Sequence, residues 1–425
     1  MRQSFNNKSK QRLNKRKAFV TRRVFNGKGI ADSADGPSVF MSDGTKKWYR
    51  NGLLNRDGDL PAVEHGDGTK KWFRDGKLHR DGAPAIIAAD GTKRWCQNGQ
   101  RHREDGPAVE LPDGGKEWLS RDRHHRDGGL PAIEHADGYK EWCVQGKRHR
   151  DGGLPAIIHP DGKQEWYKDG KLHRDEDMPA LIHADGTMEW YRNGKLHRDF
   201  DRPAYINKTD GTRRWHKDGG LHRENGPAVT KPDGSFDWYL DNERHREGGP
   251  AVHRAGGAEE WYVKGERHRD DGPAFTVPGI EESWFQHGRH HRVDGPAITR
   301  ADGSEEWYCE GRRHRADGPA LKAKDGTLEW YFEDERHRDA GPAIEHPDGI
   351  REYYLHGQRH REDGPAIERP SGKHRYYLKD RETTVEEIDA LIDQRRRECV
   401  EAIGVALEGG LAQSIMPMRV LRMKR

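Results

Sequence analysis

The sequence predicts an all-β protein built as an elongated array of tandem β-hairpin repeats, a single-layer twisted sheet or solenoid with a C-terminal helix. One aromatic position recurs every 23 to 25 residues, and most intervals contain two turns that include glycine. The hydrophobic content is 31% and the mean hydropathy is -1.19, too low for the core of a compact 425-residue globule. Thirteen Trp and 13 Tyr argue against disorder. An array in which each repeat buries some surface against its neighbours fits these observations.

The aromatic series sets the length of the repeat. Of its 14 intervals, nine are 23 residues, four are 24 and one is 25, which indicates about fifteen copies of one unit over residues 25–382. We expect the recurring tryptophans to form a structural ladder along the array. The series consists of Trp48, Trp72, Trp95, Trp118, Trp142, Trp166, Trp190, Trp215, Trp238, Trp261, Trp284, Trp307 and Trp330, followed by Tyr353 and Tyr376.

Two short strands and a bend fill each repeat. In the copy DGTKRWCQNGQRHREDGPAVELP, Asp90-Gly91 and Asn98-Gly99 are typical of two-residue type I′ turns. The six residues between them predict one strand that contains Trp95, and the next strand runs through the His-Arg pair. Proline fixes φ and lacks an amide donor, so the Asp-Gly-Pro at 105–107 predicts a kink. Nearly all variation in repeat length falls between His-Arg and Pro-Ala, so we expect a surface bend there.

One segment indicates a family. The sequence WYRNGKLHR from Trp190 to Arg198, followed by a small-residue bend, a short apolar strand and Asp210-Gly211, resembles a divergent MORN repeat. The resemblance covers roughly residues 25–382. It departs in having Arg where the family has Gly after the His, and in lacking the Tyr-Glu-Gly-Glu strand. Similarity to MORN proteins implies a curved single-layer sheet used for scaffolding, protein interaction or membrane-surface association, with no catalytic residues to carry over.

Residues 1–24 predict a flexible basic arm. Positions 1–22 hold eight basic residues and no acidic one, whereas residues 23–382 carry a net charge of about -5 and residues 383–425 carry none. Such an arm is typical of contact with nucleic acid or an anionic surface such as a membrane, and a solvated terminus or a targeting peptide is the alternative. The candidate residues for an anionic partner are Lys8, Lys10, Arg12, Lys15, Arg16, Lys17 and Arg22.

Residues 383–425 predict an amphipathic helix and a tail. Thr384-Val-Glu-Glu387 forms a capping box, in which Thr384 caps the helix and Glu387 reaches back. The helix is expected to end near Leu407, before Gly409-Gly410. We expect it to cover the open sheet edge of the last repeat, and a dimerisation or partner helix is the alternative. Its apolar side chains at helical spacing are Ile388, Leu391, Ile392, Cys399 and Ile403.

Cysteine usage and hydropathy indicate the compartment. Cys96, Cys143, Cys309 and Cys399 form no CxxC motif or Cys/His cluster, so we expect free thiols in a reducing compartment. No stretch has the length of a membrane span, and no apolar region of signal-peptide length stands near the N-terminus. These features predict a soluble intracellular protein, cytoplasmic in the simplest case.

Thirteen His-Arg pairs recur, from His79-Arg80 to His360-Arg361. Equivalent histidines in neighbouring repeats are expected about 10 Å apart, too far to share a zinc ion, and a motif copied in every repeat marks no single catalytic place. We expect these residues to make cross-strand hydrogen bonds and to pair with the Asp or Glu of the bend; metal binding and catalysis are the alternatives. The Asp-Gly pairs lack the spacing of calcium-binding repeats. We therefore predict no enzymatic activity, metal or cofactor.

The sequence predicts a scaffold that binds a protein partner through an extended β surface. Aromatic residues interleaved with Arg and Lys could also stack on nucleic acid, although the array is slightly acidic. The alternative function is association with nucleic acid or an anionic surface through the basic arm, and the C-terminal helix offers a route to oligomers. Deleting residues 1–22 separates the two functions, because only arm-mediated binding is lost and weakens steeply with salt.

Overall fold

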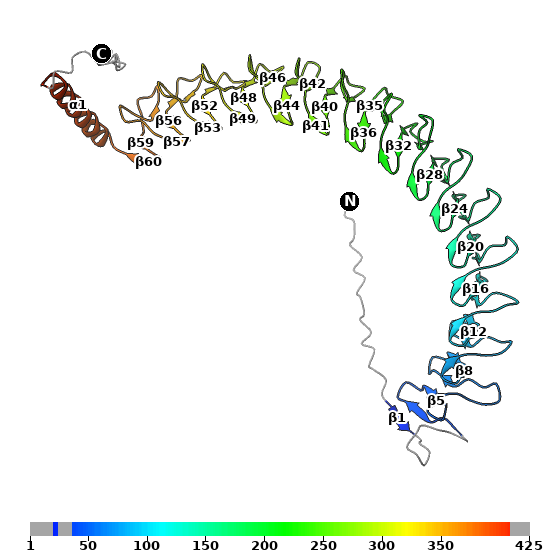
Figure 1. Cartoon of the computed structure of the whole chain (residues 1–425). Coiled ribbons are helices and arrows are strands. Elements are labelled where there is room, and N and C mark those ends of the chain that lie inside the picture. The colour runs from blue at the N-terminus through cyan, green and yellow to red at the C-terminus, as the bar shows by residue number, and fades with distance from the viewer. Residues whose placement is uncertain (1–19, 24–35, 409–425) are drawn as a thin grey trace, which may run out of the picture. The chain divides into compact units, whose positions relative to one another are not determined.

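The computed structural model describes residues 20–23 and 36–408, with side chains described as far as Ala402 and not for Arg22. The chain divides into two compact units, Met1–Gly220 and Leu221–Arg425, which are described separately. Both consist of short antiparallel strands that follow one another in chain order, and the second also carries one helix (Figure 1). This all-β array of tandem hairpins with an open sheet and a C-terminal helix confirms the predicted fold class.

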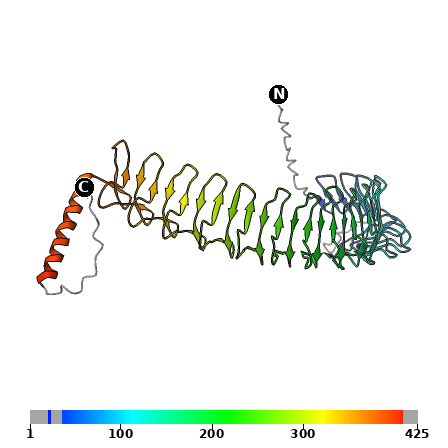
Figure 2. The same ribbon diagram turned by 90° about the horizontal axis from the view of Figure 1, so that it is seen from above.

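Each repeat contributes two strands to a long sheet and two to a separate hairpin. In the first unit, β11 (Lys93–Arg94) pairs with β10 (Ile86–Ile87) on one side and β14 (Val109–Glu110) on the other. The hairpin consists of β12 (Cys96–Gln97) and β13 (Gln100–Arg101), which pair only with each other. The second unit repeats this arrangement, and its hairpins lie side by side in chain order (Figure 2).

The predicted six-residue strand is wrong, because the chain breaks at the tryptophan. The Trp95 amide donates to the Ala108 carbonyl at 2.8 Å, and the Trp95 carbonyl accepts from His102 at 3.1 Å. Trp95 therefore marks the corner at which the chain leaves the sheet and enters the hairpin. The same pair of bonds occurs in both units, for example at Trp142 and at Trp307.

The two glycine turns differ. At the hairpin tip, Asn98 and Gly99 have φ of 52° and 90°, which confirms a turn with two left-handed residues. At the other turn Gly91 has φ of 89°, whereas Asp90 is not left-handed, so the type I′ prediction is wrong there. Gly91 donates to the Ala88 carbonyl and Ala88 donates to the Thr92 carbonyl, both at 2.9 Å. This is a wider loop, in which only the glycine needs positive φ.

Each hairpin tip is hydrogen-bonded to the preceding repeat. The Gly99 amide donates to the Leu78 carbonyl at 2.8 Å, and the Asn98 amide donates to Nδ1 of His79 at 3.2 Å. Because Nδ1 accepts, the proton lies on Nε2, which is 2.9 Å from Asp81. The histidine of the His-Arg pair thus bridges neighbouring repeats. The same backbone-to-histidine bond is made by His125, His149, His173, His197, His222, His245, His268, His291, His337 and His360.

We expect His245→Leu to lower the free energy of unfolding by about 1 kcal/mol more than His314→Leu. The first substitution removes the acceptor of the Lys264 amide, which lies 3.2 Å from Nδ1. Nδ1 of His314 is buried and has no hydrogen-bond partner among the described residues, so its removal leaves no donor unpaired. Urea unfolding of both variants measures the difference, and equal losses would contradict the bridging role.

Where the hairpin tip has no glycine, the side chain that replaces it forms a hydrogen bond to the preceding repeat. Asp122, Asn242, Asp334 and Asp380 adopt positive φ, which costs a non-glycine residue some energy. Their side-chain oxygens accept backbone amides of the preceding repeat, from Arg101, Leu221, Arg313 and Arg359 respectively. Asp and Asn therefore occupy this left-handed position, because their side chains offset its cost with a hydrogen bond.

The arginine of each His-Arg pair connects the tryptophan to the bend. The Arg269 guanidinium carbon lies 3.8 Å from the centre of the Trp261 ring, and Nη1 donates to the Pro273 carbonyl at 3.3 Å. A Cβ added to Gly272 would lie 2.6 Å from that guanidinium carbon. A side chain at this glycine would thus displace the arginine packed against it, and the alanine after the proline, Ala274, is fully buried.

Gly272→Ala is expected to lower the free energy of unfolding by about 1–2 kcal/mol, because Arg269 must leave Trp261 and the Pro273 carbonyl. Gly256→Ala is the matched control, since its Cβ would meet no atom within 4 Å and its φ is not positive. The added cost should disappear in an Arg269→Ala background. Thermal or urea unfolding of the double-mutant cycle tests this, and a persistent cost would show that the clash lies elsewhere.

The array has a strand before the first repeat and a helix after the last. β1 (Val20–Arg23) pairs with β2 (Val39–Met41), so the sheet begins within the segment assigned to the arm. The helix α1 (Val385–Glu408) begins at the predicted cap, where the Glu387 amide donates to Thr384 Oγ1.

The start of this helix is packed against the array. Ile388 is buried and Arg395 pairs with Glu362 in the last bend, whereas the side chains of residues 393–402 are exposed. The helix extends away from β59 (Tyr376–Leu378) and β60 (Arg381–Thr383) (Figures 1 and 2). Among the helix side chains described as far as Ala402, those of the first turns therefore cover the sheet end.

Two predictions from the composition concern free thiols and membrane spans. All four cysteines are free, and Cys96 and Cys143 are buried, which raises the pKa of these thiols to about 11 and about 12. Within the described ranges, no helix combines the length and apolar character needed to cross a bilayer.

Candidate functional site

The repeats are not equivalent at the bend. In four consecutive bends of the first unit, at 126–131, 150–155, 174–179 and 198–203, the step from the arginine to the proline is one residue longer than in every bend of the second unit. One earlier bend, at 56–61, has the same length. These are the repeats that lengthen the tryptophan interval from 23 to 24 or 25 residues.

The extra residue supplies a carbonyl to the next repeat. Indole nitrogens donate to these bends at 2.8–3.0 Å: Trp72 to Asp59, Trp142 to Gly129, Trp166 to Gly153, Trp190 to Asp177 and Trp215 to Asp201. After a short bend, the indole nitrogens of Trp95 and Trp261 are buried without a partner among the described residues. A long bend is therefore hydrogen-bonded to the following tryptophan.

The longer bends also expose apolar side chains. Leu130, Leu154 and Met178 stand directly before the bend proline and are about half exposed. Phe200, in the next bend, is 81% exposed. Large apolar side chains in the bends of consecutive repeats form a row, unlike the isolated apolar residues common on protein surfaces.

Grooves lie between these bends. A cleft of about 550 Å³ is bounded by Leu154 in one bend and Met178 in the next, with Trp166 and Tyr167 among its lining residues. A second cleft, of about 190 Å³, continues from Met178 to Phe200 and includes Trp190 and Tyr191. Because Met178 lines both clefts, the two form one row along the bends, which we call the groove row.

Exposed carboxylates lie along this row, and two of them pair with exposed cations, Asp175 with Lys168 and Asp199 with Arg192. Asp151 is 97% exposed and Asp175 and Asp199 are more than half exposed, whereas the arginines of the same bends lie on tryptophan rings. Burial lowers the pKa of Arg150 and Arg174. Hydrogen bonds from His173 and Lys168 lower the pKa of Asp175, so this carboxylate is ionised at neutral pH. The row thus combines apolar side chains with accessible negative charge.

The sheet strands of the same repeats carry a second apolar row. Cross-strand partners in register are Ile158 and Gln164, Gln164 and Ile182, Ile182 and Met188, and Met188 and Ile206. They belong to β22 (Ile157–Ile158), β23 (Gln164–Glu165), β26 (Leu181–Ile182), β27 (Met188–Glu189) and β30 (Tyr205–Ile206). Earlier repeats place alternating Lys and Glu at these positions, as in Lys93, Glu110, Lys116 and Glu134. Both apolar features therefore occupy residues 126–206.

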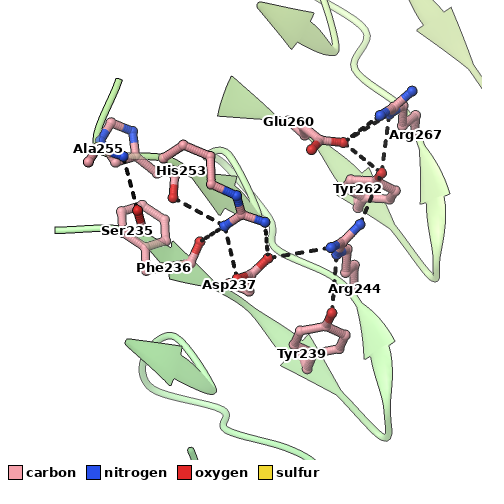
Figure 3. A network of polar contacts seen from close by, with 11 residues as sticks. Ser235, Phe236, Asp237, Tyr239, Arg244, His253, Ala255, Glu260, Tyr262 and Arg267 are labelled. Carbon is pink, nitrogen blue, oxygen red and sulfur yellow. Dashed lines mark hydrogen bonds and ion pairs between the residues drawn. The ribbon is translucent and has the colours of Figure 1, made fainter. Parts of the chain in front are cut away.

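A polar network recurs beside the sheet in the second unit. Arg244 donates to Tyr239 and Tyr262, and Arg267 contacts both Glu260 and Tyr262 (Figure 3). Burial and the hydrogen bond to Glu260 raise the pKa of Tyr262, so its hydroxyl remains a donor. This geometry ties the sheet to the hairpins, and it is repeated by Glu306, Tyr308 and Arg313.

The predicted tryptophan ladder lies at the corners of the repeats, where the rings from Trp72 to Trp330 are buried or half-buried. Among the side chains that the structure describes, no three His, Cys, Asp or Glu come together as a metal site. Arg22 falls in β1, and the other arm residues lie outside the described residues: Lys8, Lys10, Arg12, Lys15, Arg16 and Lys17.

Leu154, Met178 and Phe200 were not among the site residues predicted from the sequence. The 24-residue intervals between Trp118 and Trp190, which reflect the longer bends, were the signal that could have indicated them. No protein-family model matches the chain, and no curated protein is similar enough to be matched to it.

Proposed function

We propose that the chain is a non-enzymatic binding scaffold whose partner is a protein that docks along the bends at residues 126–203. The observation that carries this proposal is the row of two adjoining clefts, each bounded by exposed apolar side chains of consecutive repeats. Apolar anchors surrounded by charged groups are typical of protein interfaces. The MORN-like character of the repeat, which implies scaffolding, remains a prediction that agrees with this role.

The recurring His, Arg and Glu favour a structural role over catalysis. His245 is hydrogen-bonded to a neighbouring backbone amide, Arg269 is packed on an aromatic ring, and Glu306 belongs to a network copied in further repeats. A catalytic centre needs a nucleophile, a base and an orienting group in one place. The groove row is the feature that departs from periodicity, and its lining favours contact with another chain.

Leu154→Ser together with Met178→Ser is expected to weaken capture of the partner by about tenfold or more, because both apolar anchors of the larger cleft are lost. Val293→Ser is the matched control, since Val293 is a bend residue of the second unit and is 82% exposed. Pull-down with the full-length protein, followed by mass spectrometry, compares the variants with the wild type. A partner lost equally from all variants, or from none, would contradict docking at the grooves.

The arm-mediated alternative is tested in the same experiment. A deletion should stop at residue 19, because removal of β1 would expose the edge of β2. If the protein lacking residues 1–19 loses every partner, and binding of the intact protein falls steeply with salt, the arm is the binding element and the groove proposal fails.

A further inference from the structure

The spacing of the grooves restricts what can lie along them. In the first unit β22, β23, β26, β27 and β30 pair in sequence, so each repeat adds two neighbouring strands to the sheet. Strands in a sheet are about 4.8 Å apart, so equivalent sheet positions recur about every 10 Å, and the bends that lead into these strands are expected to recur at about the same interval. A partner that follows Leu154, Met178 and Phe200 must therefore present anchors at about this interval.

Peptide backbone conformations differ in the distance between successive side chains that point in the same direction. Side chains on one face of a β-strand repeat about every 6.6 Å, which falls out of register after one groove. A polyproline II helix has three residues per turn and a rise of about 3.1 Å, so every third side chain recurs at about 9.3 Å on one face. An α-helix can match the interval at every seventh residue, but its diameter of about 10 Å keeps most of it outside clefts that separate adjacent bends.

The charge of the row selects the composition of the partner. The four consecutive long bends each place an accessible carboxylate directly after the arginine: Asp127, Asp151, Asp175 and Asp199. The arginines of these bends lie on tryptophan rings and donate to the proline carbonyls, so they do not pair with these carboxylates. Asp175 and Asp199 pair instead with Lys168 and Arg192. The ion-pair partners of Asp127 and Asp151 among the described residues are histidines, so Lys or Arg of a partner would complement these two carboxylates.

We propose that the groove row binds an extended polyproline II segment of a partner protein, with an apolar residue at every third position and basic residues between. This inference rests on the proposed function and specifies its ligand class. Aromatic-lined surfaces suit such segments, and the half-buried Tyr167 and Tyr191 line these clefts. A polyproline II segment has no internal hydrogen bonds, so its carbonyls can accept from Lys168 and Arg192, which line the clefts and also pair with Asp175 and Asp199.

The test uses synthetic peptides and the full-length protein. The peptide (Leu-Pro-Lys)4 places leucine at every third position, (Leu-Pro-Lys-Pro)3 places it at every fourth, and (Leu-Pro-Glu)4 reverses the charge. Fluorescence anisotropy should give a Kd for the first peptide at least about tenfold below the other two. Leu154→Ser with Met178→Ser should abolish that preference, while Val293→Ser retains it. Asp151→Asn removes a carboxylate of the larger cleft that has only a histidine as ion-pair partner among the described residues, so it should weaken binding of (Leu-Pro-Lys)4 and reduce its dependence on salt.

Five results would overturn the inference. Equal affinity for the three peptides, or binding unaffected by the groove variants, would show that the clefts do not recognise leucine at every third position with basic residues between. Tighter binding of a helical peptide with leucine at every seventh position would assign the row to a helix. A rise of about tenfold or more in affinity on deletion of residues 1–19 would make the protein's own arm the occupant. If the groove variants lose the protein partner but no peptide binds, the proposed function stands and the ligand class is wrong.

Discussion

Trp142→Ala should lower the free energy of unfolding by about 3–5 kcal/mol, the largest stability effect expected in this chain. Trp142 is buried, Arg150 lies 3.7 Å from its ring centre, and its indole nitrogen donates to the Gly129 carbonyl at 2.8 Å. The substitution thus opens a cavity and also frees the arginine that donates to Pro155. Because repeats contact mainly their neighbours, we expect the loss to be local and to increase hydrogen exchange first in the adjacent repeats.

A matched pair of phenylalanine variants isolates the indole hydrogen bond. Trp142→Phe keeps an aromatic ring beneath Arg150 but removes the donor to Gly129, so it should destabilise the protein by about 1 kcal/mol beyond its packing cost. Trp95→Phe removes a buried donor that has no partner among the described residues, and should cost less. Urea unfolding followed by circular dichroism compares them. Equal losses would mean that the long bend contributes no hydrogen bond of consequence.

Glu306→Gln should lower the free energy of unfolding at neutral pH by about 2–3 kcal/mol. Glu306 accepts from Arg300 and Arg313, each at 2.7 Å, and from the Tyr308 hydroxyl at 2.9 Å. The Glu306 side chain is buried, so removing its charge deprives Arg300 and Arg313 of their shared ion-pair partner. The two arginines retain some contact with solvent, which limits the loss. Glu305→Gln is the control, because Glu305 makes a longer pair of 3.8 Å with Lys322.

The Glu306 contribution should depend on pH. Burial raises the pKa of this carboxyl, but hydrogen bonds from Arg300, Arg313 and Tyr308 outweigh burial, and the pKa lies below its ordinary value of 4.5. A lowered folded-state pKa stabilises the protein above the ordinary value, and that stabilisation is lost as the pH falls through the folded-state pKa. The difference between wild type and Glu306→Gln should therefore be constant down to about pH 5 and shrink below about pH 4. A difference that persists unchanged in acid would contradict the ion-pair explanation.

The elements predictable from the sequence are those set by local chemistry. Asn98-Gly99 requires two left-handed residues, and proline in Asp-Gly-Pro excludes a regular strand, so the hairpin tip and the bend could be located without coordinates. The break at Trp95 could not, because it depends on the Ala108 carbonyl, which lies beyond the hairpin and accepts the Trp95 amide. The turn at Asp90-Gly91 was wrongly predicted because the Ala88 carbonyl, outside the two-residue motif, closes it.

The candidate site was predictable only in outline. In the sequence, Leu154 and Met178 resemble ordinary bend residues, and their alignment follows from the spacing of strands in the sheet. The role of the extra bend residue could not be predicted for a similar reason. Gly153 accepts from Trp166, which belongs to the following repeat, so counting residues within one repeat shows an insertion but not its partner.

The bond from Trp166 to Gly153 also bears on how such repeats can be exchanged. If a segment is cut at the Asp161-Gly162 turn, the bend is separated from the indole that uses it. A segment cut at the hairpin tips, from Gly146 to Asp169, keeps the bend and the tryptophan together. Grafting, circular permutation or consensus design of this array should therefore place its joints at the hairpin tips, so that each transferred module brings its own acceptor.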